Sequence, residues 1–241
     1  MICVLVWAGA TLAAQAQDPK LETGNESATL RVLHERLRHP EGDSHDDYLL
    51  ACGVGNEKTV PLLLERFKHD FGFPEPPPEL GQKFGFVCTQ VHLVDALRRI
   101  TNTDQGLFYT RWAKWWDANK DFSVDRWVRD GFVERGLHPS NPVDDRFAME
   151  LIETLTDERQ FVVINASVLL RQAPHGKRME WLDAAAWSGQ PKRRMGALWF
   201  LENILKAGRE DLIRKLATDP VPEVREKADA VLKARQAPQR Q

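Results

Sequence analysis

Side chains that commonly perform chemistry are scattered along this sequence. The 241 residues include seven His and three Cys, but no H-E-x-x-H or C-x-x-C motif and no nucleophile elbow. Catalysis needs an acid, base or nucleophile held by partners in a defined arrangement. Because no such constellation is present, we predict no catalytic residues, no cofactor-binding residues and no metal ligands, and we expect a protein that is not an enzyme.

Two short segments nevertheless contain residues that could bind an ion. His45-Asp46-Asp47 has three potential metal ligands in a row, but adjacent residues on a helix point in different directions and cannot close on one ion. A solvated helix start explains these acidic residues better, because carboxylates are favourable at a helix N-terminus. Gly53-Val-Gly55 is too short for a phosphate-binding loop and lacks the strand-to-helix context.

The cysteines suggest a different chemistry. Cys3 would be removed with an N-terminal signal, which leaves Cys52 and Cys88. An even pair in an oxidising compartment is compatible with a disulfide between them. Two free thiols are the alternative, because free Cys is among the most frequently buried residue types. Both states remain open from the sequence.

Tryptophans invite a binding hypothesis, because Trp is enriched at the energetic centres of interfaces. Trp112, Trp115 and Trp116 have helical spacing and therefore share one helix face. A stripe of this kind is more typical of a core than of a contact surface. Trp199 is the better candidate for a contact, because in the internal repeat described next it shares a column with Val168 and Ala230, one position before a column that is expected to be buried.

The repeat occupies the last third of the chain. The segments 160–170, 191–201 and 222–232 align without gaps, and each copy begins 31 residues after the previous one. Their apolar residues recur at i, i+3 and i+4, which predicts one apolar stripe on a helix. Three columns align in this way: Ala166, Ala197 and Ala228; Leu169, Phe200 and Val231; and Leu170, Leu201 and Leu232.

A shorter helix is expected before each of these segments, over residues 143–155, 177–187 and 209–217. Pro191 and Pro222 then fall in the first turn of the second helix, where a missing N–H costs little. Each copy is therefore predicted to be a helical hairpin. One hairpin cannot bury its apolar face alone, so neighbouring copies must stack.

The last copy resembles a HEAT repeat, whose second helix reads D-x-x-x-x-V-R-x-x-A-x-x-x-L, as in the segment from Asp219 to Leu232. Arg194 and Asp157 match in the earlier copies, although Val163 occupies the arginine column of the first. The resemblance implies a right-handed α-α superhelix, an armadillo-like solenoid. It also assigns four residues to a structural hydrogen-bonded ladder between successive repeats: Asp157, Asp219, Arg194 and Arg225.

The repeats set the expected organisation of the whole chain. We predict irregular HEAT-like repeats over 28–136, regular ones over 137–235 and a disordered tail over 236–241. An inserted loop over 71–86 contains four prolines and cannot be helical. The segment from Ala96 through the tryptophans at 112–116 resembles one that is common in exported bacterial HEAT-like proteins.

The first residues predict export. Residues 1–14 are almost wholly apolar and Ala14-Gln15-Ala16 has the small-x-small pattern of a cleavage site. The apolar run is shorter than the ~20 residues that span a bilayer, which disfavours a membrane anchor. We predict a signal peptide over 1–17, a disordered linker over 18–27 and a periplasmic or secreted protein without a later membrane span.

Charge and repeat architecture together favour a protein partner. The net charge of −2 argues against nucleic acid, which requires a clustered basic surface. Solenoids bind partners on their concave helix face, so we expect an interaction scaffold of the cell envelope. The alternatives are an accessory subunit of an envelope complex, with the Pro-rich loop as its docking arm, and a HEAT-like lyase-type enzyme. The predicted partner-binding residues are Trp199, Met195, Lys192, Arg193 and Arg171.

Overall fold

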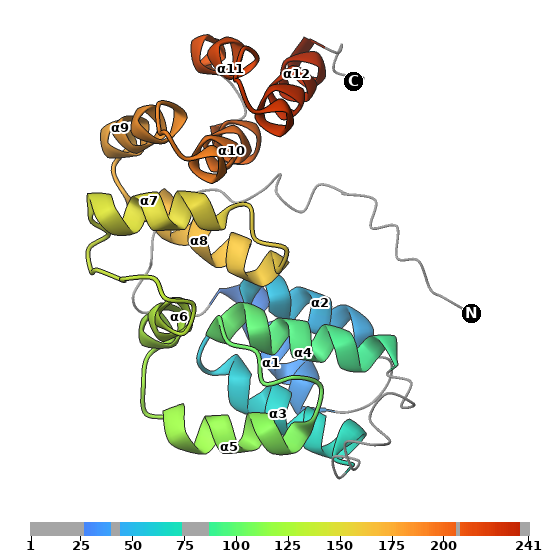
Figure 1. Cartoon of the computed structure of the whole chain (residues 1–241). Coiled ribbons are helices and arrows are strands. Elements are labelled where there is room, and N and C mark those ends of the chain that lie inside the picture. Colours follow the sequence, from blue (N-terminus) through green and yellow to red (C-terminus); the bar gives the residue numbers. More distant parts are fainter. Residues whose placement is uncertain (1–26, 40–43, 74–86, 206–207, 237–241) are drawn as a thin grey trace, which may run out of the picture.

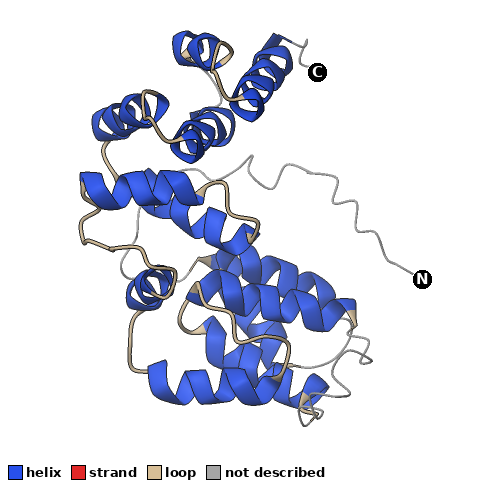
Figure 2. Ribbon diagram, in the orientation of Figure 1, coloured by secondary structure: helices blue, strands red, loops and turns tan. Residues whose placement is uncertain are grey.

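The computed structural model describes residues 27–39, 44–73, 87–205 and 208–236. These residues form twelve α-helices and one π-helical turn, with no strand among them (Figure 2). The all-α prediction is therefore confirmed. The predicted signal peptide, nearly all of the linker, most of the Pro-rich insertion and the last five residues lie outside the described ranges.

The helices follow one another along the chain and pack mostly with their neighbours in sequence (Figure 1). Their bounds are α1 Ala28–Arg38, α2 His45–Val54, α3 Thr59–Phe71, α4 Cys88–Thr101, α5 Tyr109–Asn119, α6 Val124–Val133, α7 Asp145–Thr154, α8 Gln160–Gln172, α9 His175–Ala186, α10 Pro191–Phe200, the π-helical turn Leu201–Leu205, α11 Glu210–Leu216 and α12 Pro222–Gln236.

Local sequence signals explain where several helices begin. The side chains of Ser27, Ser123 and Asp144 each accept a hydrogen bond from the backbone N–H three residues later, at 3.2, 3.3 and 2.8 Å. These caps satisfy N–H groups that the first helical turn leaves without a partner. Pro191 and Pro222 are the first residues of α10 and α12, as predicted.

The N-terminal half is built around α2 and α4, which lie side by side and run in the same direction. At their starts His45 lies near Cys88, and at their ends Gly55 lies against Ile100. Helices α1, α3 and α5 complete this half and enclose one hydrophobic core. Parallel packing of α2 and α4 brings together side chains that are more than 40 residues apart in sequence.

The aromatic stripe of α5 belongs to this core. Trp112 is fully buried, and Trp115 and Trp116 are half-buried and pack against the ring of Trp127 in α6. The indole N–H of Trp112 donates to the carbonyl of Gly106 at 2.8 Å. The prediction that these tryptophans serve the core is confirmed, and α6 is a helix that the sequence pattern had not indicated.

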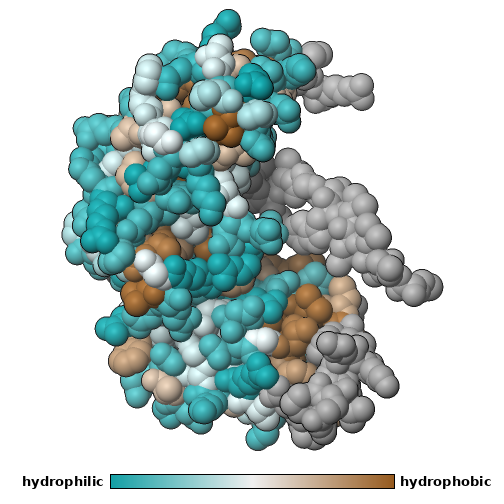
Figure 3. All heavy atoms as spheres, in the orientation of Figure 1, coloured by the Kyte–Doolittle hydropathy of each residue, from teal (hydrophilic) through white to brown (hydrophobic). Residues whose placement is uncertain are grey.

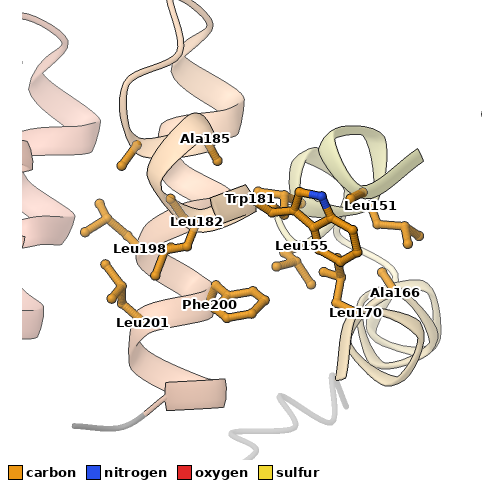
Figure 4. Close-up of a cluster of buried hydrophobic side chains, with 14 of the residues drawn as sticks. Leu151, Leu155, Ala166, Leu170, Trp181, Leu182, Ala185, Leu198, Phe200 and Leu201 are labelled. Carbon is orange, nitrogen blue, oxygen red and sulfur yellow. The ribbon is translucent and has the colours of Figure 1, made fainter. Parts of the chain in front are cut away.

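Helices α7 to α12 form three successive pairs. The three repeat alanines are completely buried, and so are Phe200 and Leu201. Figure 4 shows Trp181 of α9 among Leu151, Leu155 and Leu170 of the preceding pair, so its indole crosses the boundary between pairs. Two of the 31-residue columns therefore mark packing positions, because all three residues of the alanine column and of the column Leu169, Phe200 and Val231 are buried.

Some predicted boundaries were wrong by a few residues. Phe71, placed in the insertion, is the last residue of α3, and Gln236, placed in the tail, is the last residue of α12. Ser27, placed in the linker, caps α1. These ends depend on capping and on tertiary contacts, which the apolar pattern does not report. No helix among the described residues is long and apolar enough to span a membrane.

A buried polar cluster joins the two halves of the chain where α4 packs against α8. The side-chain amide of Asn165 in α8 donates to the carbonyl of Arg99 at 3.1 Å and to Oδ1 of Asn102 at 3.2 Å. Its own oxygen accepts from the guanidinium of Arg99. Asn102 in turn donates to the carbonyl of Val128 at 2.8 Å. Asn165 thus links α8 to the C-terminal end of α4 through three hydrogen bonds.

Replacing Asn165 with Ala is expected to lower the free energy of unfolding by about 1–3 kcal/mol, because buried polar groups on α4 lose their partner. Urea unfolding followed by circular dichroism measures the loss. Ser167→Ala is the matched control, since the Ser167 hydroxyl donates to the carbonyl of Ile164 in its own helix, and this substitution should cost less than about 1 kcal/mol. Equal losses in the two variants would contradict a special role for Asn165.

Candidate functional site

The predicted partner-binding residues lie on two helices, with Arg171 on α8 and the other four on α10. Lys192 is exposed, while Trp199, Met195, Arg193 and Arg171 are half-buried. Trp199 and Met195 pack partly against the hydrophobic core. Both apolar side chains therefore have a buried part that fixes them and an exposed part that can contact another molecule.

The exposed positions on this surface repeat from one pair to the next. Val168, Trp199 and Ala230 occupy one column of the 31-residue repeat, and all three are at least partly exposed. A second column, seven residues earlier in each copy, contains half-buried Phe161 and exposed Lys192 and Glu223. Both columns lie on the second helix of each pair. We call the solvent-facing side of α8, α10 and α12 that carries these two columns the second-helix face.

Charge is distributed unevenly on the second-helix face. Arg193 lies 3.5 Å from a carboxylate oxygen of Glu153, and Lys227 pairs with Glu202 at 2.6 Å. Arg171 donates to the carbonyl of Asn203 at 3.4 Å. Lys192, Arg193 and Arg171 are cations of α8 and α10, and Arg193 pairs with Glu153, so this surface favours an acidic or mixed partner.

In the view of Figure 3, the part of the molecule that contains α9 to α12 is mainly hydrophilic with small hydrophobic patches. A larger hydrophobic area lies lower, where α2 and α4 run. Trp187, at the end of α9, is another exposed aromatic residue: 68% of its surface is accessible, and Nζ of Lys215 lies 3.3 Å from the centre of its ring. From the sequence, Trp187 was predicted to end the helix over 177–187, and it was not among the predicted partner-binding residues.

The predicted ladder residues behave differently from one another. Arg194 of α10 bonds both carboxylate oxygens of Asp219, at 2.6 and 2.9 Å, and this buried pair joins the second hairpin to the third. Arg225 donates to the carbonyl of Asp219 at 2.7 Å. Asp157 instead binds Arg159, two residues away, at 2.7 Å. Of these four residues, only Arg194 and Asp219 connect successive pairs through their side chains.

The electrostatics of Asp219 follow from this geometry. Burial by itself would raise the pKa of its carboxyl group. Hydrogen bonds from Arg194 and from the backbone N–H of Val221, with the positive charges of Arg194 and Lys215, outweigh burial and hold the pKa below its usual value. Asp219 is therefore ionised in the folded protein at neutral pH, as a salt bridge requires.

A disulfide between Cys52 and Cys88 was compatible with the sequence, but both thiols are free in the structure. Cys88 begins α4 beside the start of α2, whereas Cys52 lies seven residues further along α2. That separation along a helix is about 10 Å, too far for a disulfide. Burial and the charge of Asp95 raise the pKa of Cys52 to about 12, so this thiol is unreactive.

Cys88 has different neighbours, which the sequence interpretation missed. Its Sγ lies 3.1 Å from Nε2 of His92 and 3.8 Å from Nε2 of His45. Partial burial and then the ring of His45 lower the pKa of His92. The spacing of Cys88 and His92, four residues apart, was a usable signal because such residues share a helix face. No short stretch of sequence could have identified His45 as a further neighbour of Cys88, because His45 lies 43 residues earlier in the chain.

Comparisons with protein-family models, with curated proteins and with solved structures found no match for this chain.

Proposed function

We propose that this protein is a HEAT-like helical-repeat scaffold that binds another protein through the second-helix face of α8, α10 and α12. The observation that carries the proposal is Trp199 in the middle copy, which packs partly against the hydrophobic core and is partly exposed. An aromatic side chain that is both anchored and partly exposed is the type of residue that dominates binding energy at interfaces.

The chemistry of this face suggests what the partner presents. Lys192 and Arg193 lie on the same helix as Trp199, Arg193 lies 3.5 Å from Glu153, and Arg171 of α8 donates to the carbonyl of Asn203, four residues after Trp199. A partner segment with an apolar side chain between acidic residues would bury its apolar part on Trp199 and place its carboxylates near the cations. The proposal includes a solenoid arrangement of the three pairs and export to the periplasm or beyond. The apolar start and the Ala14-Gln15-Ala16 pattern support export.

Site-specific photo-crosslinking tests the proposed face. A photoactivatable residue at Val168, which is 39% exposed, or at exposed Lys192 is expected to give the same protein adduct in the cell envelope. The same residue at Arg146, exposed on α7 and outside the second-helix face, is the control. Equal adducts from Arg146, or no adduct from either position on α8 and α10, would contradict the proposal.

With the captured partner purified, Trp199→Ala is expected to weaken binding at least about tenfold, as for an aromatic anchor at an interface. Lys192→Glu is expected to weaken binding by slowing association and to change its salt dependence. Lys192 is exposed, so this second variant should leave the melting temperature unchanged. Calorimetry measures the affinity, and Trp187→Ala serves as the control for loss of an exposed aromatic residue. Unchanged affinity in both face variants would show that binding occurs elsewhere.

A further inference from the structure

The first turns of α2 and α4 bring three potential metal ligands to one place. His45 is the first residue of α2, Cys88 is the first residue of α4, and His92 lies one turn later on α4. Because α2 and α4 lie side by side and run in the same direction, both starts face the same region. The arrangement combines a residue pair on one helix with a third residue 43 positions earlier in the chain.

The donor atoms are already close to one another. Sγ of Cys88 lies 3.1 Å from Nε2 of His92 and 3.8 Å from Nε2 of His45, and the three ligand atoms all lie within 4.8 Å of one another. The two imidazole rings are nearly perpendicular, with centroids 4.6 Å apart. Both Nε2 atoms therefore point at the same sulfur from different directions.

The two sulfur–nitrogen distances are close to those of a tetrahedral metal site. Zinc binds thiolate sulfur at about 2.3 Å and imidazole nitrogen at about 2.0–2.1 Å, which places ligand atoms about 3.3–3.6 Å apart. The observed sulfur–nitrogen distances of 3.1 and 3.8 Å lie on either side of that range. One sulfur and two nitrogens suit Zn²⁺, whereas Mg²⁺ and Ca²⁺ prefer oxygen ligands.

A carboxylate lies beside the first ligand in the position that metal sites often use. Nδ1 of His45 is 3.5 Å from Oδ1 of Asp46, while Nε2 of the same ring faces Cys88. A carboxylate on the far ring nitrogen fixes the orientation and tautomer of a metal-binding imidazole. The segment His45-Asp46-Asp47 thus supplies one ligand and one orienting group, although its three residues cannot all bind one ion.

We propose that His45, Cys88 and His92 form a binding site for one Zn²⁺ ion, with the fourth coordination position open. Three protein ligands with an exposed cysteine leave that position to water or to another donor. The ion fastens the start of α4 to the start of α2 and so stabilises the N-terminal half of the chain. The site is separate from the second-helix face, so its failure and the failure of the proposed function are distinguishable.

Cobalt substitution tests the site directly, because Co²⁺ bound to a thiolate gives a near-ultraviolet charge-transfer band and tetrahedral Co²⁺ gives intense visible bands. The reduced, chelator-treated chain without an affinity tag is titrated with Co²⁺ and then with Zn²⁺. We expect one Co²⁺ per chain, a cobalt–thiolate band, and loss of that band as Zn²⁺ displaces the cobalt. A chain that shows no thiolate band overturns the proposal.

Matched variants identify the ligands. Cys88→Ser is expected to abolish the thiolate band, whereas Cys52→Ser should keep it because Cys52 is a separate thiol further along α2. His45→Ala and His92→Ala should each weaken Co²⁺ binding by more than about tenfold, and His69→Ala, at an exposed histidine of α3, should not. Circular dichroism checks that each variant is folded. Retention of the band in Cys88→Ser, or its loss in Cys52→Ser, shows that the metal binds elsewhere.

Discussion

Replacing Asp219 with Asn is expected to lower the free energy of unfolding by about 3 kcal/mol or more. The substitution leaves the charge of Arg194 in the interior without its counter-charge, and an unpaired buried charge is far more costly than the pair is favourable. The side chains of Arg194 and Asp219 are only 9% and 5% exposed. Urea unfolding followed by circular dichroism measures the loss. Because this pair joins the second hairpin to the third, the C-terminal pair α11/α12 should be the first part to open.

Asp157 provides a control from the same column of the repeat. Its carboxylate pairs with Arg159, whose side chain is 49% exposed, and exposed pairs contribute less than about 1 kcal/mol. Asp157→Asn should therefore change stability by less than about 1 kcal/mol. If Asp157→Asn lowered the free energy of unfolding as much as Asp219→Asn, the cost would depend on the place of the residue in the repeat and not on burial of the ion pair.

Lowering the pH should remove the stabilisation that ionised Asp219 gives to the folded protein. The pKa of this carboxyl group is lowered in the folded protein, so ionisation of Asp219 stabilises the fold above the unfolded-state pKa of about 3.9. That stabilisation is lost as the pH falls through the folded-state pKa. The difference in stability between the original chain and Asp219→Asn is therefore expected to shrink in strong acid. A difference that grows with falling pH would contradict this assignment.

Replacing Gly196 with Ala is expected to cost about 3 kcal/mol or more, although Ala is the better helix former. A Cβ at Gly196 would lie 1.9 Å from the carbonyl oxygen of Ile152 and 2.8 Å from its carbonyl carbon. Backbone atoms cannot rotate aside, so α10 must move away from α7 and lose packing along the whole contact. Thermal and urea unfolding measure the effect.

Gly176 is the matched control, because it is also a helical glycine. No atom lies within 4 Å of a Cβ built at Gly176 in α9. Gly176→Ala should therefore leave stability unchanged or raise it by up to about 1 kcal/mol, the intrinsic preference of a helix for Ala. Destabilisation of both variants to the same extent would show that the close approach of α10 and α7 is not what matters at Gly196.

Much of the helical layout followed from the sequence, because helices depend on local spacing. The apolar columns predicted α8, α10 and α12 with starts that match the structure, and the breaks between them predicted shorter helices before each. The burial of Ala166, Ala197 and Ala228 followed from the same columns. Helix α6 was missed, even though a Ser cap precedes it, because its turns lie outside the repeat.

The residue at which α10 comes close to α7 could not be predicted from the sequence. The repeat marks Ala197 as the recurring small residue of α10, but a close approach of α10 to α7 occurs at the adjacent Gly196, where an added Cβ would lie 1.9 Å from the carbonyl oxygen of Ile152. One position along a helix changes the direction of a side chain by about 100°. Which of two adjacent small residues faces the neighbour depends on how the two helices are rotated, and packing across the interface fixes that rotation.

Sequence alone determined the class of structure: local periodicity and caps define where most of the helices form, and equal spacing defines which residues are equivalent. The tertiary structure alone decided which distant side chains meet. It separated Cys52 from Cys88, gathered Cys88 with His45 and His92, and gave Asp219 a buried partner while Asp157 has a local one. The physical reason is that the register between two helices is set by the fit of complete surfaces, which no short stretch of sequence contains.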